Sequence, residues 1–115
     1  MEGGTAVERD ILSAAEVAAL RTSMGLSQAH LADMLGVNVR TVRSWESGRD
    51  KTSPSSSAAL WGLLRRHQAL TASFLEAGGV VGVSREAEGI PPRGWYLAAA
   101  GRAMTVEPDL MVEWV

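Results

Sequence analysis

Two short helical patterns meet at a single glycine in the stretch from Leu26 to Arg49, and no other part of the chain constrains the fold as strongly. In the first pattern Ser27 can cap the helix start, and Leu31 and Leu35 share one face because they are four residues apart. Gly36 supplies the left-handed residue that ends this helix and turns the chain. The sequence therefore predicts two helices that cross closely on either side of Gly36.

The second pattern covers residues 39–47, with Asn38 placed to cap its start. Val42 and Trp45, three residues apart, form its apolar inner face, and we expect Trp45 to be a core residue. The spacing from the small residue Ala32 through Gly36 to Val42 is typical of a helix-turn-helix motif. The outer face carries side chains that can hydrogen-bond to bases and phosphates: Asn38, Arg40, Thr41, Arg43, Ser44 and Ser47.

At this point the chain resembles the lambda-repressor-like, Xre-type helix-turn-helix regulators. The resemblance is carried by the segment LSQAHLADMLGV, by Asn38, Thr41 and Val42 at the entry to the second helix, and by the segment WESGR that closes it. It covers about residues 12–70, roughly half of the chain. It implies a mainly α, lambda-repressor-like helical bundle that binds double-stranded DNA with helix 39–47 in the major groove.

The outer face and the resemblance together indicate which residues contact DNA. The expected base-reading residues are Val39, Arg40, Arg43 and Ser44, and the expected phosphate-binding residues are Gln28, Asn38, Thr41, Arg49 and Lys51. Arginine binds guanine O6 and N7 through two hydrogen bonds, so we expect at least one G·C pair in each half-site. Glu46 matches the acid that follows the aromatic residue in the family, and we expect it to pair with a nearby arginine in a structural role.

The charge distribution agrees with this assignment. The formal net charge of the chain is −2, but residues 20–70 carry +4 while residues 1–19 and 71–115 carry −3 each. Positive charge is therefore concentrated around the motif, as attraction to phosphates requires. The modest value of +4 implies only modest affinity for DNA of unrelated sequence.

The remaining sequence divides into three parts: a flexible tail (residues 1–11), the DNA-binding domain (12–77) and a C-terminal extension (78–115). Ser13 and Glu16 form a capping box at the start of a first helix. From about residue 55 to 76 a further helix carries more apolar positions than one face can bury in a small bundle. This surplus indicates a second partner surface.

The C-terminal extension is predicted to be a small α+β unit. Val80, Val81 and Val83 indicate a short strand, and the alternation in residues 110–115 indicates a terminal strand. Residues 95–104 stay open, because their alanines favour a helix while Trp95 and Tyr96 suit a strand. Aromatic residues are enriched at protein interfaces. We therefore expect the extension to form a dimer interface from Trp95, Tyr96, Leu110, Val112 and Trp114.

These observations favour a homodimeric repressor that reads an inverted-repeat operator. The alternative is an antitoxin or other interaction module in which residues 71–115 bind a second protein. The sequence lacks paired carboxylates at a credible pocket, a phosphate-binding glycine loop, cysteines, and histidines at metal-binding spacing. We therefore expect no enzyme activity, cofactor or metal site. It also lacks a signal peptide and a transmembrane stretch, so we expect a cytoplasmic protein that does not bind membranes.

Overall fold

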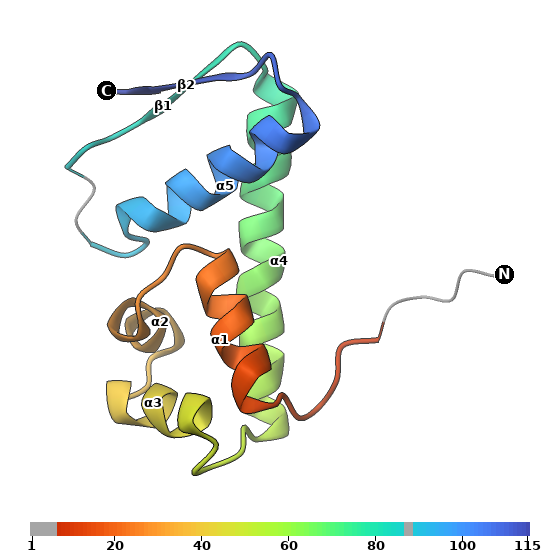
Figure 1. The fold of residues 1–115 in the computed structure, drawn as a ribbon, viewed down its shortest axis with the longest axis vertical. Coiled ribbons are helices and arrows are strands. Elements are labelled where there is room, and N and C mark those ends of the chain that lie inside the picture. Colours follow the sequence, from red (N-terminus) through yellow and green to blue (C-terminus); the bar gives the residue numbers. More distant parts are fainter. Residues whose placement is uncertain (1–6, 87–88) are drawn as a thin grey trace, which may run out of the picture.

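The computed structural model describes residues 7–86 and 89–115 as a mainly helical chain with a small sheet. In chain order the elements are α1 (Ala14–Ser23), α2 (Gln28–Leu35), α3 (Val39–Ser47), α4 (Pro54–Ala77), β1 (Val80–Val83), α5 (Arg93–Val106) and β2 (Met111–Trp114). Figure 1 shows α1, α2 and α3 at one end of the long helix α4, and α5 with the two strands at its other end. This confirms the predicted helical bundle followed by a small α+β extension.

The predicted caps define where the first helices start and end. Ser13 and Glu16 form the expected capping box at the start of α1. Ser27 and Asn38 each accept a backbone hydrogen bond at the starts of α2 and α3. Gly36 has the left-handed conformation predicted for the turn, with a φ of 70°. These hydrogen bonds pair backbone groups that would otherwise lack partners at the helix ends, and so they define where α2 ends and α3 begins.

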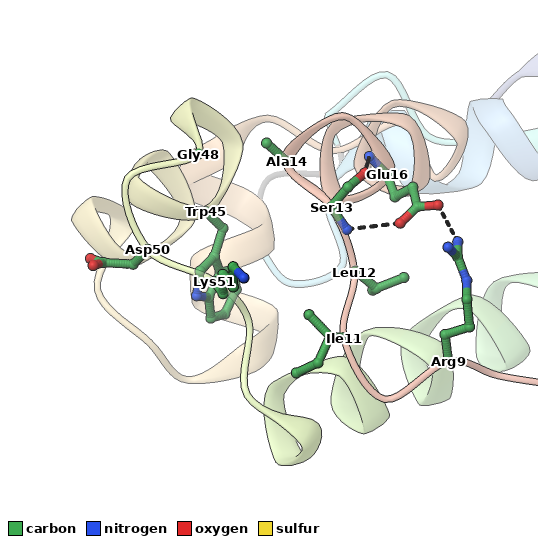
Figure 2. Close-up of a pocket in the computed structure, with 10 residues that line it drawn as sticks. All are labelled: Arg9, Ile11, Leu12, Ser13, Ala14, Glu16, Trp45, Gly48, Asp50 and Lys51. Carbon is green, nitrogen blue, oxygen red and sulfur yellow. Dashed lines mark hydrogen bonds and ion pairs between the residues drawn. The ribbon is translucent and has the colours of Figure 1, made fainter.

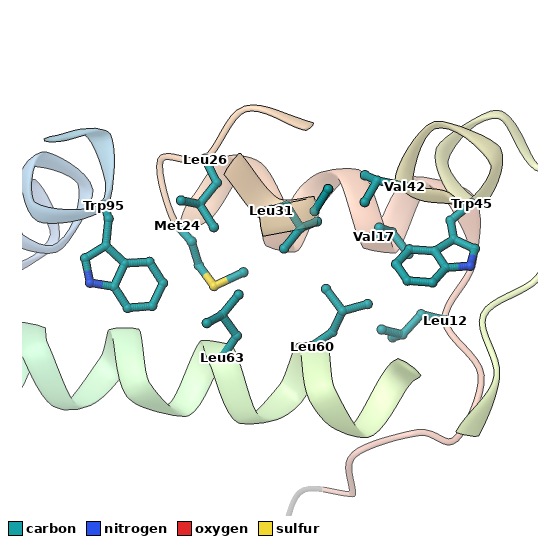
Figure 3. Packing of buried hydrophobic residues seen from close by; sticks show 11 residues of the cluster. Leu12, Val17, Met24, Leu26, Leu31, Val42, Trp45, Leu60, Leu63 and Trp95 are labelled. Atoms are coloured by element: carbon teal, nitrogen blue, oxygen red, sulfur yellow. The ribbon is translucent and has the colours of Figure 1, made fainter. Parts of the chain in front are cut away.

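The first core lies between α4 and the three short helices α1, α2 and α3. Val42 and Trp45 of α3 are buried in it as predicted, with 0% and 6% of their surface exposed. The cluster comprises Leu12, Val17, Met24, Leu26, Leu31, Ala32, Val42, Trp45, Leu60, Leu63 and Trp95. Figure 3 shows these side chains in a row along α4, with Trp95 of α5 at one end. The first core therefore includes one residue of the C-terminal extension.

The surplus apolar face of α4 is covered by the chain itself. The first half of this helix contributes Leu60 and Leu63 to the first core, whereas Phe74 and Leu75 pack against a second core. This second core consists of Val81, Val83, Ala103 and Leu110. The partner surface indicated by the sequence is thus occupied by α5 and the sheet of the same chain.

Residues 95–104, left open between helix and strand, lie within helix α5. Trp95, Ala99 and Ala103 are four residues apart and all buried, so they form the face that packs on the rest of the fold. The helix crosses between β1 and β2, which pair in parallel from Val80 with Met111 to Val83 with Trp114. A parallel pair requires such a crossover connection.

A group of polar hydrogen bonds connects α5 to α4 and to the end of α1. Arg102 donates to Nδ1 of the buried His67 at 3.1 Å and to the carbonyl oxygen of Ser23 at 2.8 Å. Because Arg102 can only donate, Nδ1 accepts and the ring proton of His67 lies on Nε2, which donates to the Trp95 carbonyl at 2.9 Å. Burial lowers the pKa of His67, which favours the neutral ring that these two hydrogen bonds require.

The expected N-terminal tail covers residues 1–11, of which residues 1–6 lie outside the described residues. Nearer to α1, the Arg9 carbonyl accepts a hydrogen bond from the indole of Trp61 at 3.0 Å. Glu8 forms an ion pair with Arg65. Both partners belong to α4, so residues 8 and 9 lie against that helix. None of the helices in the described ranges is both long enough and apolar enough to cross a bilayer.

Candidate nucleic-acid interface

Helix α3 presents its polar face to solvent because its apolar face is fixed in the first core. Asn38 accepts a hydrogen bond from the Arg40 backbone N–H at 2.8 Å and so sets the start of the helix. Gly48, with a φ of 80°, ends it. Burial of Val42 and Trp45 then leaves Arg40 and Arg43 exposed on the opposite side. The whole side of α3 that carries the arginines is therefore accessible to a ligand.

The outer face of α3 and the loop after it surround an open depression of about 320 Å³. Its lining residues are Arg40, Arg43, Ser44, Ser47 and Arg49. The structure thus brings together three of the four predicted base-reading residues and one predicted phosphate-binding residue. Val39 is half-buried and packs against the first core, so only part of its side chain is exposed.

The arginines of this depression differ from three others in the described part of the chain. Within the described residues, Arg9, Arg21 and Arg65 each pair with a glutamate. The guanidinium groups of Arg40, Arg43 and Arg49 form no ion pair with any described residue. Their positive charge therefore remains uncompensated at one exposed site, which favours an anionic ligand.

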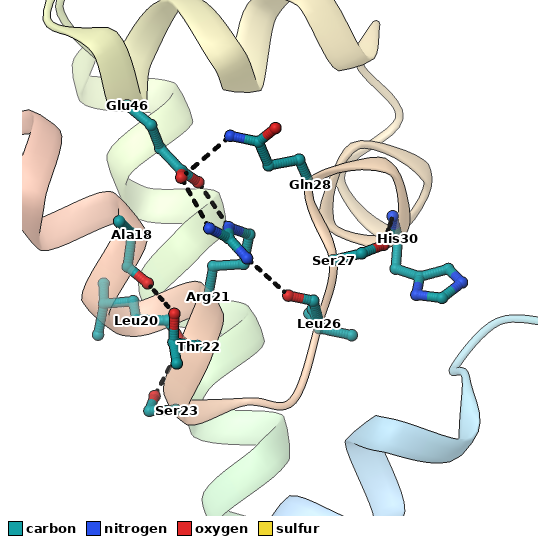
Figure 4. A network of polar contacts seen from close by, with 10 residues as sticks. All are labelled: Ala18, Leu20, Arg21, Thr22, Ser23, Leu26, Ser27, Gln28, His30 and Glu46. Atoms are coloured by element: carbon teal, nitrogen blue, oxygen red, sulfur yellow. Dashed lines mark hydrogen bonds and ion pairs between the residues drawn. The ribbon is translucent and has the colours of Figure 1, made fainter.

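A network beneath this surface connects α3 to α1 and α2 (Figure 4). Arg21 donates to both carboxylate oxygens of Glu46, at 2.7 and 2.8 Å, and to the Leu26 carbonyl at 3.0 Å. These hydrogen bonds hold the pKa of Glu46 below its usual value, although burial opposes the effect. The expected structural role of Glu46 is confirmed. Gln28, predicted to bind phosphate, donates one amide hydrogen to Glu46 at 3.2 Å.

Comparison with known proteins agrees with this geometry. The helix-turn-helix family model matches residues 17–60, which run from α1 into the first half of α4. This segment is therefore similar to helix-turn-helix domains of the Xre type. No curated protein matches the chain. Domains of this family bind DNA, so the similarity supports a DNA-binding regulator.

The helix-turn-helix domain contains one polar contact that sequence reasoning missed. The Ser44 hydroxyl donates to the carboxylate of Asp50, and the Asp50 backbone N–H donates to the Ser44 carbonyl at 3.3 Å. Asp50 therefore lies at the edge of the predicted reading surface. The two residues are six apart and joined through a glycine turn, so no helical or strand periodicity indicates their contact.

Lys51, also predicted to bind phosphate, lies beside a different depression of the helix-turn-helix domain (Figure 2). This hollow of about 390 Å³ lies between the start of α1 and the loop after α3. Its charged residues are Arg9, Glu16, Asp50 and Lys51, two of each sign, and Arg9 pairs with Glu16. It therefore lacks the surplus positive charge of the depression on α3. No group of metal-binding side chains occurs among the described residues.

Two of the residues predicted for a dimer interface are inside the protomer. Trp95 is 3% exposed in the first core and Leu110 is 4% exposed in the second. Their side chains are not accessible to a second chain, so we remove both from the predicted interface. Tyr96 and Val112 are half-buried, and Trp114 is 45% exposed. A sequence pattern cannot separate these cases, because an apolar residue can be buried in its own chain or between chains.

Proposed function

We propose that this protein is a sequence-specific transcriptional regulator whose helix α3 enters the major groove of double-stranded DNA. The observation that supports this most strongly is the exposed arginine surface of α3, which lacks acidic partners among the described residues. A major groove admits one α-helix, and arginine can read guanine in it. In this proposal Arg40, Arg43, Ser44 and the exposed part of Val39 contact base edges.

The phosphate contacts would flank this helix. Asn38 uses its side-chain oxygen for the cap of α3, which leaves its amide hydrogens for a phosphate. Gln28 has a second amide hydrogen beyond the one donated to Glu46. With Thr41, Arg49 and Lys51 these residues surround the start and the end of α3. Such contacts fix the position of a protein on DNA without reading its sequence.

We propose further that the regulator acts as a homodimer. The net charge of residues 20–70 is only +4, so a single reading helix would bind weakly. Two copies related by a two-fold axis read two half-sites and add their contacts. The C-terminal extension offers a surface for this pairing, because Val80, Met111, Trp114 and Val115 are between 45% and 78% exposed.

Repression by covering a promoter is the simplest activity for such a dimer, and it places the protein in the cytoplasm with the DNA. The test is selection of bound sequences from a random duplex library at physiological salt, where non-specific binding is weak. We expect an inverted repeat whose half-sites are about one helical turn apart. Failure of the folded protein to enrich any sequence would overturn the proposal.

The exposed apolar residues of the extension also support the alternative function. In that case residues 71–115 would bind a second protein, as in an antitoxin, and the chain alone would stay monomeric. Light scattering on the full chain separates the two functions. A dimeric mass together with an inverted-repeat operator favours the homodimeric regulator. A monomer that enriches no operator favours the partner-dependent module.

A further inference from the structure

The loop after α3 folds back onto the last turn of that helix. The Asp50 backbone N–H donates to the Ser44 carbonyl at 3.3 Å, and the Ser47 hydroxyl donates to the same carbonyl at 3.1 Å. The Arg49 backbone N–H donates to the Ser47 hydroxyl at 3.3 Å. These contacts place the Asp50 side chain beside Ser44, whose hydroxyl donates to it. The pairing of the two side chains thus follows from the backbone of the loop.

This pairing removes one of the two ways in which a serine can bind a base. A hydroxyl has one hydrogen to donate and two lone pairs that accept, and an ionised carboxylate only accepts. Because the hydrogen of Ser44 is directed at Asp50, the hydroxyl offers only lone pairs to a ligand in the depression. An unpaired serine, by contrast, can contact either kind of base edge.

We propose that Asp50 determines sequence specificity by holding Ser44 as a hydrogen-bond acceptor. This inference depends on the proposed function, in which the outer face of α3 reads bases. In the major groove adenine and cytosine present an amino group, whereas guanine and thymine present acceptor oxygens at the corresponding positions. Ser44 therefore selects adenine or cytosine at the base it contacts and disfavours guanine and thymine.

The charge of Asp50 adds to this selection. Its carboxylate accepts a hydrogen bond from Ser44, which lines the depression together with Arg40, Arg43 and Arg49. It forms no ion pair with these arginines in the described structure. A negative group near a guanine O6 or a thymine O4 repels that oxygen. The same surface thus carries arginines, which prefer guanine, and the Ser44–Asp50 pair, which disfavours guanine at a neighbouring base.

The test compares sequence selections for the full-length wild type, Ser44→Ala and Asp50→Ala, with Asp109→Ala as a charge-matched control. Asp109 is exposed and lies in the C-terminal extension, at the other end of α4 from α3. For the wild type we expect about tenfold preference for adenine or cytosine at one position. Both Ser44→Ala and Asp50→Ala should reduce that preference to about twofold. Asp109→Ala should leave it intact, and circular dichroism checks that each variant is folded.

Three results would overturn the inference. If Ser44→Ala retains the preference, the hydroxyl does not read that base. If Asp50→Ala raises affinity equally for all sequences without changing any preference, Asp50 acts only through its charge. If the position lost in Ser44→Ala prefers guanine or thymine in the wild type, the hydroxyl donates rather than accepts. Absence of any enriched sequence for the wild type would instead overturn the proposed function itself.

Discussion

At the scale of single residues, Arg21 and the arginines of α3 have two distinct roles. Arg21 is largely buried and holds Glu46 of α3 through two hydrogen bonds, so it sets the position of the helix. Arg40 and Arg43 are exposed and lack acidic partners among the described residues. No described residue forms a hydrogen bond or ion pair with their guanidinium groups, which therefore remain available to a ligand. The same residue type therefore supports the fold in one place and the binding surface in another.

Replacement of Arg40 by alanine tests the binding surface directly. We expect Arg40→Ala to weaken binding to the selected operator by about 1–3 kcal/mol and to relax preference at one base position. Fluorescence anisotropy on the operator and on single-base variants measures both effects. Arg65→Ala removes the same charge from α4, away from the reading helix, and should leave base preference unchanged. Equal weakening on every sequence would make Arg40 a phosphate contact.

Glu46 provides a stability prediction with a defined pH dependence. Because folding lowers its pKa, the Glu46 contribution to the free energy of unfolding is complete above about pH 4.3 and is lost as the pH falls through the lower folded value. Glu46→Gln should cost about 1–3 kcal/mol at pH 7. The difference from wild type should shrink towards pH 3. Urea denaturation at several pH values measures it, and a difference independent of pH would contradict the assignment.

Sequence reasoning was reliable for residues whose roles follow from spacing. Val42 and Trp45 were predicted as core from their three-residue separation, and both are buried. The contact between Ser44 and Asp50 was missed because it depends on how the loop folds back. The aromatic character of Trp95 favours an interface, but it does not indicate which surface covers the side chain, and the structure buries it in the first core. The DNA contacts themselves remain predictions.

At the scale of elements, the helices with clear caps were predictable and α5 was not. Its residues give conflicting signals, because alanines favour a helix and aromatic residues favour a strand. Tertiary packing decides the outcome. As a helix, α5 directs Trp95 into the first core and Ala103 into the second, and small residues between them allow close approach to α4. The parallel pairing of β1 with β2 then follows from the direction in which α5 crosses.

Two glycines of α5 give opposite predictions for the same substitution. A Cβ at Gly94 would lie 2.2 Å from the Gly25 carbonyl oxygen, so α5 crosses the turn after α1 in direct backbone contact. We expect Gly94→Ala to destabilise the fold by about 1–3 kcal/mol through overpacking. A Cβ at Gly101 meets nothing within 4 Å. Gly101→Ala should stabilise the helix by about 0.5–1 kcal/mol.

Thermal unfolding of both variants beside wild type measures these effects. The pair is internally controlled, because the helix, the substitution and the added methyl group are the same. A similar melting temperature for the two variants would show that the crossing of Gly25 and Gly94 is not tight in solution. Gly94→Ala should also retain the helix content of wild type at low temperature, because alanine itself favours a helix.

At the scale of the whole molecule, α4 connects the helix-turn-helix end to an end with exposed apolar residues. Its first half completes the helix-turn-helix domain and its second half carries the C-terminal extension (Figure 1). Trp114 on β2 lies beside the guanidinium groups of Arg85 and Arg93, whose carbons are 5.5 and 5.9 Å from the centre of its ring. These contacts hold a large aromatic side chain at the surface, where a second copy could bury it.

Trp114→Ala should therefore shift the light-scattering mass of the protein toward that of a monomer at micromolar concentration. The loss of an aromatic anchor weakens an interface more than the loss of a peripheral residue does. Ile11→Ala is the control, because Ile11 is also exposed and apolar but precedes α1, away from β2. An unchanged mass for Trp114→Ala would remove Trp114 from the interface.

The place of Trp95 in the first core also has a consequence for the order of events during synthesis. The ribosome makes the chain from its N-terminus, and Trp95 follows Leu63 by about thirty residues. At about 5–20 residues per second, this delay is roughly 2 to 6 seconds. During that interval Met24 and Leu63 lack the indole that covers them in the finished protein. The first core of the nascent chain therefore stays incomplete until α5 has been synthesised.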